Sequence, residues 1–356
     1  IIATVLPATD VYAEPRNVID AKKAAKGLHQ IFPDTSEQEF YDKLISKKGK
    51  VYLRRKISHN DMLPVNNLGE AAINFESSVK RFYSYSNLFS HILGVTDNDN
   101  NGISGIEKAY DADLKDGFPV VISMDAYIQD IIRTHLREGL KTYDAKSALA
   151  ILTNVHTGEI IALIKYPDFN PNNDEKGNPE ITRPIATMGL YEMGSTFKLF
   201  NTAAALDNGI VTNPFKKEYD TSKSYKIGGF LIKEPHPHEN LLNAVEVLQY
   251  SSNIGSLQIA LKMGAEKQKS FLRKMGLLDK VPISDTFQLT ELAKPTPNDW
   301  HSDISVANIS FGYGLQVTPL HLILAVNSLV NGGVYVLPRL LAMDDEELPT
   351  GFRVMK

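Results

Sequence analysis

The sequence of 356 residues contains no cysteine, and this absence removes several kinds of chemistry at once. Disulfides, thiolate metal sites and cysteine nucleophiles are all excluded. The sequence also has no apolar run approaching the roughly 18 residues that suggest a membrane-spanning helix. A large charge of one sign is lacking too, because the net charge of −4 gives no electrostatic reason to expect a nucleic-acid partner. The composition, 43% hydrophobic and 22% charged, is that of an ordinary globular protein.

The composition changes near position 117, and we predict a boundary there between a domain of residues 1–117 and a domain of residues 118–356. The first part is polar and rich in turns. Its patterns predict a strand at residues 5–13 and helices at residues 17–31 and 35–45. The chain begins without an initiator methionine or a basic flank, unlike a signal peptide. We therefore expect it to be cut from a longer protein, with any membrane anchor upstream.

The second part alternates apolar strands and helices. Residues 147–154 and 159–166 predict a hairpin around a short His-Thr-Gly loop, and we expect both faces of its strands to be covered because nearly every residue is apolar. Apolar spacing and capping residues predict a strand at 120–125, a polar loop at 167–184, and helices at 128–140, 195–208, 240–250, 254–263 and 320–330. Helices packed on a small sheet predict an α+β or three-layered domain.

Two stretches resemble metal-binding patterns, but each has a simpler interpretation. Asp97-Asn98-Asp99-Asn100-Asn101-Gly102 fits the first half of an EF-hand loop, yet the twelfth position, which should be a bidentate glutamate, is Lys108. A cluster of Asn, Asp and Gly favours a turn. His236-Pro237-His238-Glu239 offers two histidines and a carboxylate on a proline-bearing segment, which favours a loop over a metal site. We predict neither a metal nor a cofactor.

The segment Gly194-Ser195-Thr196-Phe197-Lys198 predicts an activated serine nucleophile. If the apolar run that follows is a helix, Ser195 and Lys198 share a face at its first turn. The serine lies in the positive end of the helix dipole, and the lysine can accept its proton if burial lowers the lysine pKa. Being mostly neutral near pH 7 requires a shift of about three units from ~10.4. Phe197, Leu199 and Phe200 are the apolar neighbours that could desolvate the amine.

A Ser-x-Asn motif downstream distinguishes this site from a second copy of the same pattern. Ser77-Ser78-Val79-Lys80 also matches Ser-x-x-Lys, but it lacks a preceding glycine and a following apolar helix. The site at Ser195 is followed by Ser251 and Asn253, at a predicted break between two helices. A hydroxyl there could relay a proton between Lys198 and a leaving amine, and the amide could join the lysine to a substrate backbone. The alternative is that Ser195 and Asn253 only cap core helices.

Together with further motifs, these residues resemble the class B penicillin-binding proteins, the D,D-transpeptidases of cell-wall synthesis. The motifs that resemble the family are Ile1–Pro7 with Glu14-Pro15, Arg81-Phe82-Tyr83, His91-Ile92-Leu93-Gly94, Gly105-Ile106-Glu107, Thr157–Ala162 with Pro171-Asn172, and Ser310–Gly314 leading into Thr318-Pro319-Leu320. With asparagine at position 253, this motif resembles that of the septal, cell-division branch of the family (FtsI type), since aspartate is usual at this position in the elongation branch.

The resemblance implies a penicillin-binding transpeptidase fold, with helices packed on a central, mainly antiparallel sheet, behind an N-terminal mixed α/β pedestal domain. It implies that Ser195 attacks peptidoglycan stem peptides at the bond between terminal D-alanines, that Lys198 is the base, that Ser251 relays the proton and that Asn253 positions the peptide. Gly194, Ser195 and Asn253 would contact the donor peptide or a β-lactam antibiotic. It also implies an inner-membrane protein with a periplasmic catalytic domain and divisome partners, including a septal glycosyltransferase.

One departure from the family concerns its third motif, Lys-Thr-Gly or Lys-Ser-Gly, which is absent from the sequence. In the family this motif lies on the strand beside the nucleophile and helps to complete the oxyanion hole. Loss of one oxyanion donor typically costs about 10²–10³ in rate. We expect the residues of this strand to be missing from the chain, with further omissions at Gly117-Phe118 and Met343-Asp344. The alternatives are an elongation-type transpeptidase, a β-lactam sensor or β-lactamase, and an inactive divisome scaffold.

Overall fold

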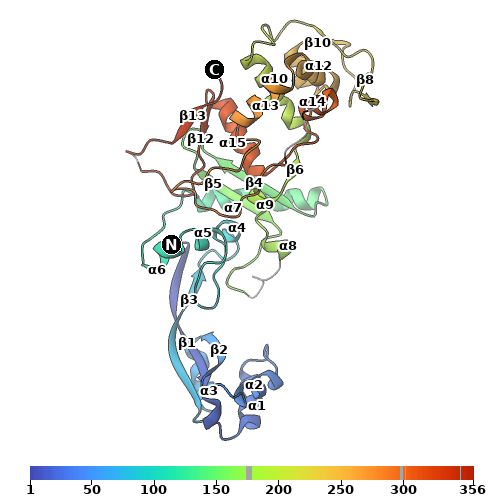
Figure 1. Cartoon of the computed structure of the whole chain (residues 1–356). Helices are drawn as coiled ribbons and strands as arrows, with labels where there is room; N and C mark the ends of the chain where they lie inside the picture. The colour runs from blue at the N-terminus through green and yellow to red at the C-terminus, as the bar shows by residue number, and fades with distance from the viewer. Residues whose placement is uncertain (174–178, 297–299, 301, 345) are drawn as a thin grey trace. The chain divides into compact units, whose positions relative to one another are not determined.

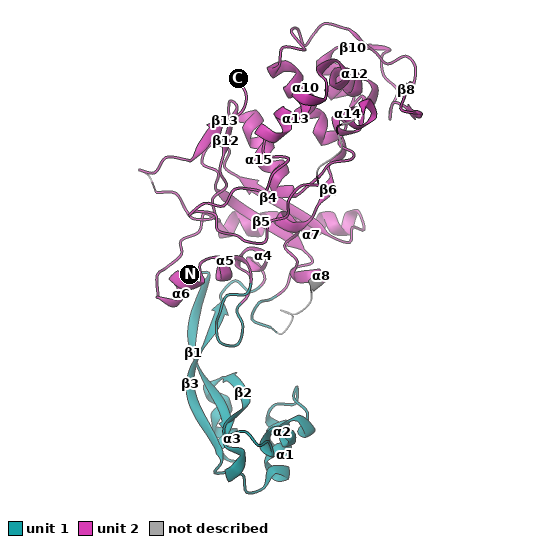
Figure 2. Ribbon diagram, viewed as in Figure 1, with its two compact units in different colours: residues 1–86, 96–103, 170–174 teal, residues 87–95, 104–169, 175–356 magenta. Residues whose placement is uncertain are grey.

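The computed structural model describes residues 1–173, 179–296, 300, 302–344 and 346–356. Its contacts divide the chain into two compact units (Figure 2). The first unit comprises residues 1–86, 96–103 and 170–174, and the second comprises the remainder. Residues 87–95 and 104–117 therefore pack with the second unit, so the compact units do not divide at position 117. The domain boundary inferred from composition stays a prediction.

The first unit is built on a three-stranded antiparallel sheet in the order β2-β1-β3. The elements are β1 (Ala3–Ala13), a 3₁₀ turn η1 (Pro15–Asn17), α1 (Ala21–Ile31), α2 (Glu37–Leu44), β2 (Val51–Ile57), α3 (His59–Asn66) and β3 (Ile73–Tyr83). Strand β1 pairs with β3 along its whole length. The core gathers between the sheet and the helices, around Val11, Leu28, Phe40, Leu44 and Leu53.

Two of the three helices of the first unit, α1 and α2, were predicted from the sequence, and α3 was not. Helix α2 lies within the predicted range, whereas α1 begins at Ala21 rather than at Asn17. Asp20 accepts a hydrogen bond from the Lys23 N–H and caps the helix, so the preceding residues form the separate turn η1. The segment at Asp97 is a turn, as predicted, because its carboxylate accepts hydrogen bonds from the backbone N–H groups of Asp99 and Asn101.

The second unit combines short strands with many helices (Figure 1). Before Ser195 it contains α4 (Ser90–Leu93), α5 (Gly105–Ala109), α6 (Asp111–Lys115), α7 (Ala126–Thr142), β4 (Ala148–Thr153), β5 (Ile160–Tyr166), α8 (Pro179–Thr182), α9 (Ile185–Met188) and β6 (Tyr191–Glu192). Around and after it come η3 (Gly194–Thr196), α10 (Phe197–Asp207), β7 (Tyr219–Asp220), β8 (Tyr225–Ile227), β9 (Phe230–Ile232), β10 (Leu241–Leu242), α11 (Ala244–Gln249), α12 (Asn253–Met263) and α13 (Ala265–Lys274). The remaining elements are α14 (Asp303–Ser310), β11 (Gln316–Val317), α15 (Pro319–Val330), β12 (Val334–Val336) and β13 (Gly351–Arg353).

The predicted hairpin forms the centre of a layered arrangement. Strands β4 and β5 pair antiparallel, and α7 and α15 lie on opposite sides of them in Figure 1. Gln129 of α7 is fully buried, and its amide exchanges hydrogen bonds with the backbone N–H and C=O of Leu163. On the other side, Asn327 of α15 bonds the Thr153 hydroxyl. The mixed α+β architecture with an antiparallel central ladder agrees with the prediction.

Four local predictions for this unit are wrong or incomplete. Residues 120–125 do not form a strand: only Ile122 makes a bridge, to Leu341, and Val121 is 66% exposed. Strand β4 is only half-buried, with Leu152 41% exposed, so its two faces are not both covered as predicted. Helix α11 begins at Ala244, after its Asn243 cap, later than the pattern suggested. The predicted loop at 167–184 contains the short helix α8, and its residues 174–178 lie outside the described part of the chain.

Helix α10 lies among α11, α12, α13 and α14, each of which contacts it. This cluster holds the residues that the sequence singles out. Across the described residues, none of the helices is both long enough and apolar enough to cross a lipid bilayer.

Candidate active site

The site begins at a glycine that opens a helical turn. Gly194 has a φ of +55°, in the left-handed region that glycine tolerates, and Ser195 follows in the turn η3, which runs directly into α10. The Gly194 N–H donates to the carbonyl of Gly312 at 3.2 Å. Ser195 is exposed at this first turn, where helix N–H groups have no intrahelical acceptor.

Lys198 lies one turn further along and connects all the candidate residues. Its Nζ is 3.1 Å from Ser195 Oγ, as the three-residue spacing predicts. The same nitrogen is 2.5 Å from the Ser251 carbonyl oxygen, 3.0 Å from Ser251 Oγ and 2.8 Å from Asn253 Oδ1. The structure therefore brings together the two halves of the predicted site, which are more than fifty residues apart in the sequence. Gly194, also predicted to contact substrate, adjoins them.

The hydrogen-bonding capacity of these groups indicates what Lys198 can do. The Ser251 carbonyl and Asn253 Oδ1 can only accept, so each takes an N–H from the amine. A neutral amine has two N–H groups and one lone pair, and this lone pair is then left for a hydroxyl proton. Asn253 Nδ2 lies 3.4 Å from the Lys233 carbonyl, which fixes the amide in this orientation. The arrangement suits a lysine that accepts a proton from Ser195.

Burial makes the neutral form of Lys198 accessible. The side chain is 1% exposed, and its desolvation lowers the pKa of the amine to about 8, although the Glu234 carboxylate acts in the opposite direction. Phe197 and Phe200, which are close to Lys198 in the sequence, are both buried, as expected. Leu199 is 42% exposed and does not belong to this apolar surround, which corrects the prediction. The reason is geometric, since one position on a helix turns the side chain by about 100°.

Ser251 occupies a backbone conformation that its type rarely adopts. Its φ is +53°, and it follows the last turn of α11, where its N–H donates to the Leu248 carbonyl and the Ser252 N–H donates to the Val247 carbonyl. This pair of bonds is a Schellman motif, whose left-handed position is usually glycine. The sharp reversal presents both the carbonyl and the hydroxyl of Ser251 to Lys198. The sequence predicted the helix break but not this conformation.

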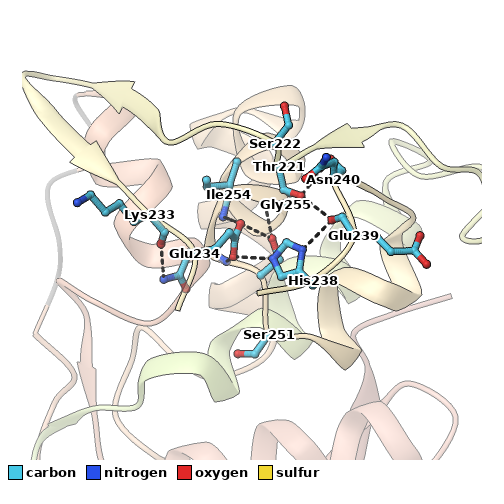
Figure 3. A network of polar contacts seen from close by, with 12 residues as sticks. Thr221, Ser222, Lys233, Glu234, His238, Glu239, Asn240, Ser251, Ile254 and Gly255 are labelled. Atoms are coloured by element: carbon cyan, nitrogen blue, oxygen red, sulfur yellow. Dashed lines mark hydrogen bonds and ion pairs between the residues drawn. The ribbon is translucent and has the colours of Figure 1, made fainter. Parts of the chain in front are cut away.

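Two residues that the sequence analysis did not assign to the site lie beside the Ser-x-Asn motif. The carboxylate of Glu234 accepts hydrogen bonds from the Ser252 hydroxyl and from the N–H groups of Asn253 and Ile254 (Figure 3). His238, weighed as a metal ligand, instead contacts Glu234 and stacks on Tyr250. A glutamate nineteen residues from Asn253 carries no local sequence signal for this contact.

The structure also accounts for the other patterns in the sequence. Ser77 and Lys80 lie on strand β3, where residues three apart point to opposite faces. The single tryptophan, Trp300, lies in the core, since it is 9% exposed and its indole N–H donates to Gln268. Within the described ranges, no group of three or more histidine, aspartate or glutamate side chains is arranged to hold a metal ion.

A glycine after α14 lies against the turn that contains Ser195. Gly312 has a φ of +87°, and a Cβ placed there would lie 1.9 Å from the carbonyl oxygen of Gly194. The next loop residues are also tied to the turn, because the Gly314 N–H donates to the Glu192 carboxylate at 2.6 Å and β11 pairs with β6. The Ser-Phe-Gly-Tyr-Gly stretch thus packs against the backbone that precedes Ser195.

Comparison with known proteins gives matches over both parts of the chain. Residues 148–354 match the family described as "Penicillin binding protein transpeptidase domain", and residues 1–119 match the "Penicillin-binding Protein dimerisation domain". The fold is similar to that of a peptidoglycan synthetase from Bifidobacterium adolescentis, with a TM-score of 0.71 at 18% identity, covering 100% of this chain and 76% of that one.

Curated relatives carry consistent names. The "Probable peptidoglycan D,D-transpeptidase FtsI" of Caulobacter vibrioides is 31% identical, over 96% of this chain and 57% of its own length. "Peptidoglycan D,D-transpeptidase FtsI" of Escherichia coli is 28% identical, over 94% of this chain and 61% of its length. "Probable peptidoglycan D,D-transpeptidase PenA" of Neisseria gonorrhoeae is 27% identical, over 100% of this chain and 65% of its own length. The chain thus spans less than two thirds of each of these relatives. It belongs to the penicillin-binding protein transpeptidase family.

Proposed function

We propose that this chain carries the acyl-transfer centre of a peptidoglycan D,D-transpeptidase of the septal type, and that β-lactam antibiotics acylate the same serine. The observation that carries the proposal is the position of Lys198 Nζ within hydrogen-bonding distance of Ser195, Ser251 and Asn253. The names of the relatives and the asparagine at position 253 support the substrate class and the septal assignment.

In the proposed reaction, Ser195 Oγ attacks the carbonyl carbon between the two terminal D-alanines, and its proton passes to neutral Lys198. The tetrahedral intermediate collapses when the C–N bond breaks, and the proton moves from Lys198 through the Ser251 hydroxyl to the departing amine. The acyl-enzyme then reacts with the amine of a neighbouring stem peptide, which restores Ser195 and completes the cross-link. Asn253 would orient the donor peptide, and the N–H of Ser195 would face the developing oxyanion.

The test is labelling of the full-length protein with fluorescent penicillin, because the family's Lys-Thr-Gly motif is absent from these 356 residues. We expect Ser195→Ala to abolish labelling, while Ser77→Ala, a change in the second Ser-x-x-Lys pattern, leaves it intact. Labelling that survives Ser195→Ala would refute the nucleophile. Rapid release of the label would indicate a β-lactamase, and an unlabelled wild type would indicate a scaffold.

The wider setting is part of the same proposal. We infer that the full-length protein is anchored in the inner membrane with its catalytic domain in the periplasm, and that it works with divisome proteins, among them a septal glycosyltransferase. The support is the likeness to the FtsI relatives over almost the whole chain. Depletion of the protein should block septation and leave elongation intact, whereas loss of rod shape would point to the elongation branch instead.

A further inference from the structure

The N-terminal end of α12 is bound by a carboxylate from a distant loop. Glu234 Oε1 accepts from the Ser252 hydroxyl at 2.7 Å and from the Ile254 N–H at 2.9 Å, and Oε2 accepts from the Asn253 N–H at 3.1 Å. Figure 3 shows this side chain directed at the start of the helix. Hydrogen bonds from N–H groups at a helix N-terminus to a carboxylate are charge-assisted and roughly twice as strong as neutral ones.

His238 holds this carboxylate from the other side. Its Nε2 is 3.2 Å from Glu234 Oε2, an ion-pair distance without the alignment of a good hydrogen bond, and its Nδ1 is 2.8 Å from the Glu239 carbonyl. Both ring nitrogens face oxygens that can only accept, so the ring suits the doubly protonated form. Burial opposes that charge, but the two oxygens outweigh it and raise the pKa of His238. The side chain is 3% exposed and stacks on Tyr250.

The same network reaches Lys198 through one residue. Asn253 is fixed by its N–H to Glu234 and presents Oδ1 to Lys198 Nζ at 2.8 Å. Ser252, which is fully buried, donates to Glu234 and accepts from the Gly255 N–H, so its hydroxyl is fixed in both roles. Ser251, its neighbour, is thereby held in the left-handed conformation that faces the lysine.

We propose that Glu234 is a positioning residue of the acyl-transfer centre: held by His238, it fixes Ser251 and Asn253 against Lys198. The inference rests on the proposed function, and it assigns a role to a residue outside the three family motifs. Glu234 does not reach the reacting serine, so it acts through the Ser-x-Asn segment.

The charge of Glu234 gives this role a distinctive signature. The neutral polar groups facing Lys198 Nζ come from η3 and from the junction of α11 with α12, namely Ser195, Ser251 and Asn253. Among the described residues, Glu234 is the charged group that acts on the amine, and it raises the pKa that burial lowers. His238 is the titratable group in contact with that carboxylate. Removing the negative charge should therefore shift the titration of Lys198 to lower pH.

The experiment measures acylation of the full-length protein by a penicillin between pH 6 and 10. We expect Glu234→Gln to lower the plateau rate constant about tenfold, since misplacement of a catalytic group by 1 Å can cost up to about 10²-fold. The midpoint of the pH profile should move to lower pH. Glu234→Asp keeps the charge, so its midpoint should stay near that of the wild type, and this variant also separates charge from folding defects.

The matched control is Glu239→Gln, five residues along the same loop, which removes an exposed carboxylate paired with Lys217. It should change neither the plateau nor the midpoint. A second readout is independent of acylation: amide exchange at Asn253 and Ile254 should quicken at least tenfold in Glu234→Gln. An unchanged midpoint, or unchanged exchange, would overturn the inference. A wild-type protein that is not acylated would refute the proposed function instead.

Discussion

The pH dependence of acylation tests the role of Lys198 most directly. Burial lowers the pKa of its amine to about 8. At that value roughly one tenth of the side chain is neutral at pH 7 and roughly nine tenths at pH 9. If the neutral amine takes the proton of Ser195, the second-order rate constant for acylation should rise about tenfold between these two pH values and then level off.

The measurement is stopped-flow acylation of the full-length protein by a chromogenic or fluorescent penicillin, at constant ionic strength from pH 6 to 10. Lys198→Arg should remove the reaction, because arginine stays protonated over this range. Lys262→Met is the control, since Lys262 lies in the last turn of α12 with its side chain 51% exposed. A rate that is flat or falling from pH 7 to 9 would refute Lys198 as the base.

Two further predictions concern backbone positions at the site. Gly312→Ala should slow penicillin labelling by about 10²-fold, because its Cβ would lie 1.9 Å from the Gly194 carbonyl oxygen and displace the turn that contains Ser195. The control is Gly209→Ala, which is also at positive φ but has no atom within 4 Å of its Cβ. It should leave labelling unaffected despite a similar backbone strain. Ser251→Gly should be more stable than Ser251→Ala by about 1 kcal/mol in thermal unfolding, because only glycine is free of strain at a φ of +53°. Both Ser251 variants should lose acylation by about 10²-fold or more if the hydroxyl relays the proton, and normal acylation in either would contradict the relay.

Local features of the sequence were sufficient to predict seven of the fifteen α-helices that the structure describes, and to single out Ser195, Lys198, Ser251 and Asn253 as candidate site residues. The hairpin and helices α2, α10, α12 and α15 follow from apolar spacing and from caps a few residues away. The three-residue spacing of Ser195 and Lys198 likewise determines that they meet once a helix forms. A preceding glycine and a following apolar helix separated this pair from Ser77 and Lys80, which the structure places on a strand.

Tertiary packing decided the features that make the site specific. The left-handed conformation of Ser251 depends on how two helices meet. The hydrogen bond from the first N–H of α12 to the Glu234 carboxylate, and the contact of Gly312 with Gly194, each join residues that are far apart in the chain. Packing also left residues 120–125 with a single bridge, although their apolar run favoured a strand.

The sequence by itself therefore determined which chemical groups are available for the proposed reaction. Periodicity and capping act over one or two helical turns, so they are readable from neighbouring residues. The protonation state of Lys198 depends on its desolvation, and the orientation of its hydrogen-bond partners depends on contacts between residues more than fifty positions apart in the sequence. Those are set only when the helices pack, because burial and the direction of a side chain are properties of the assembled fold.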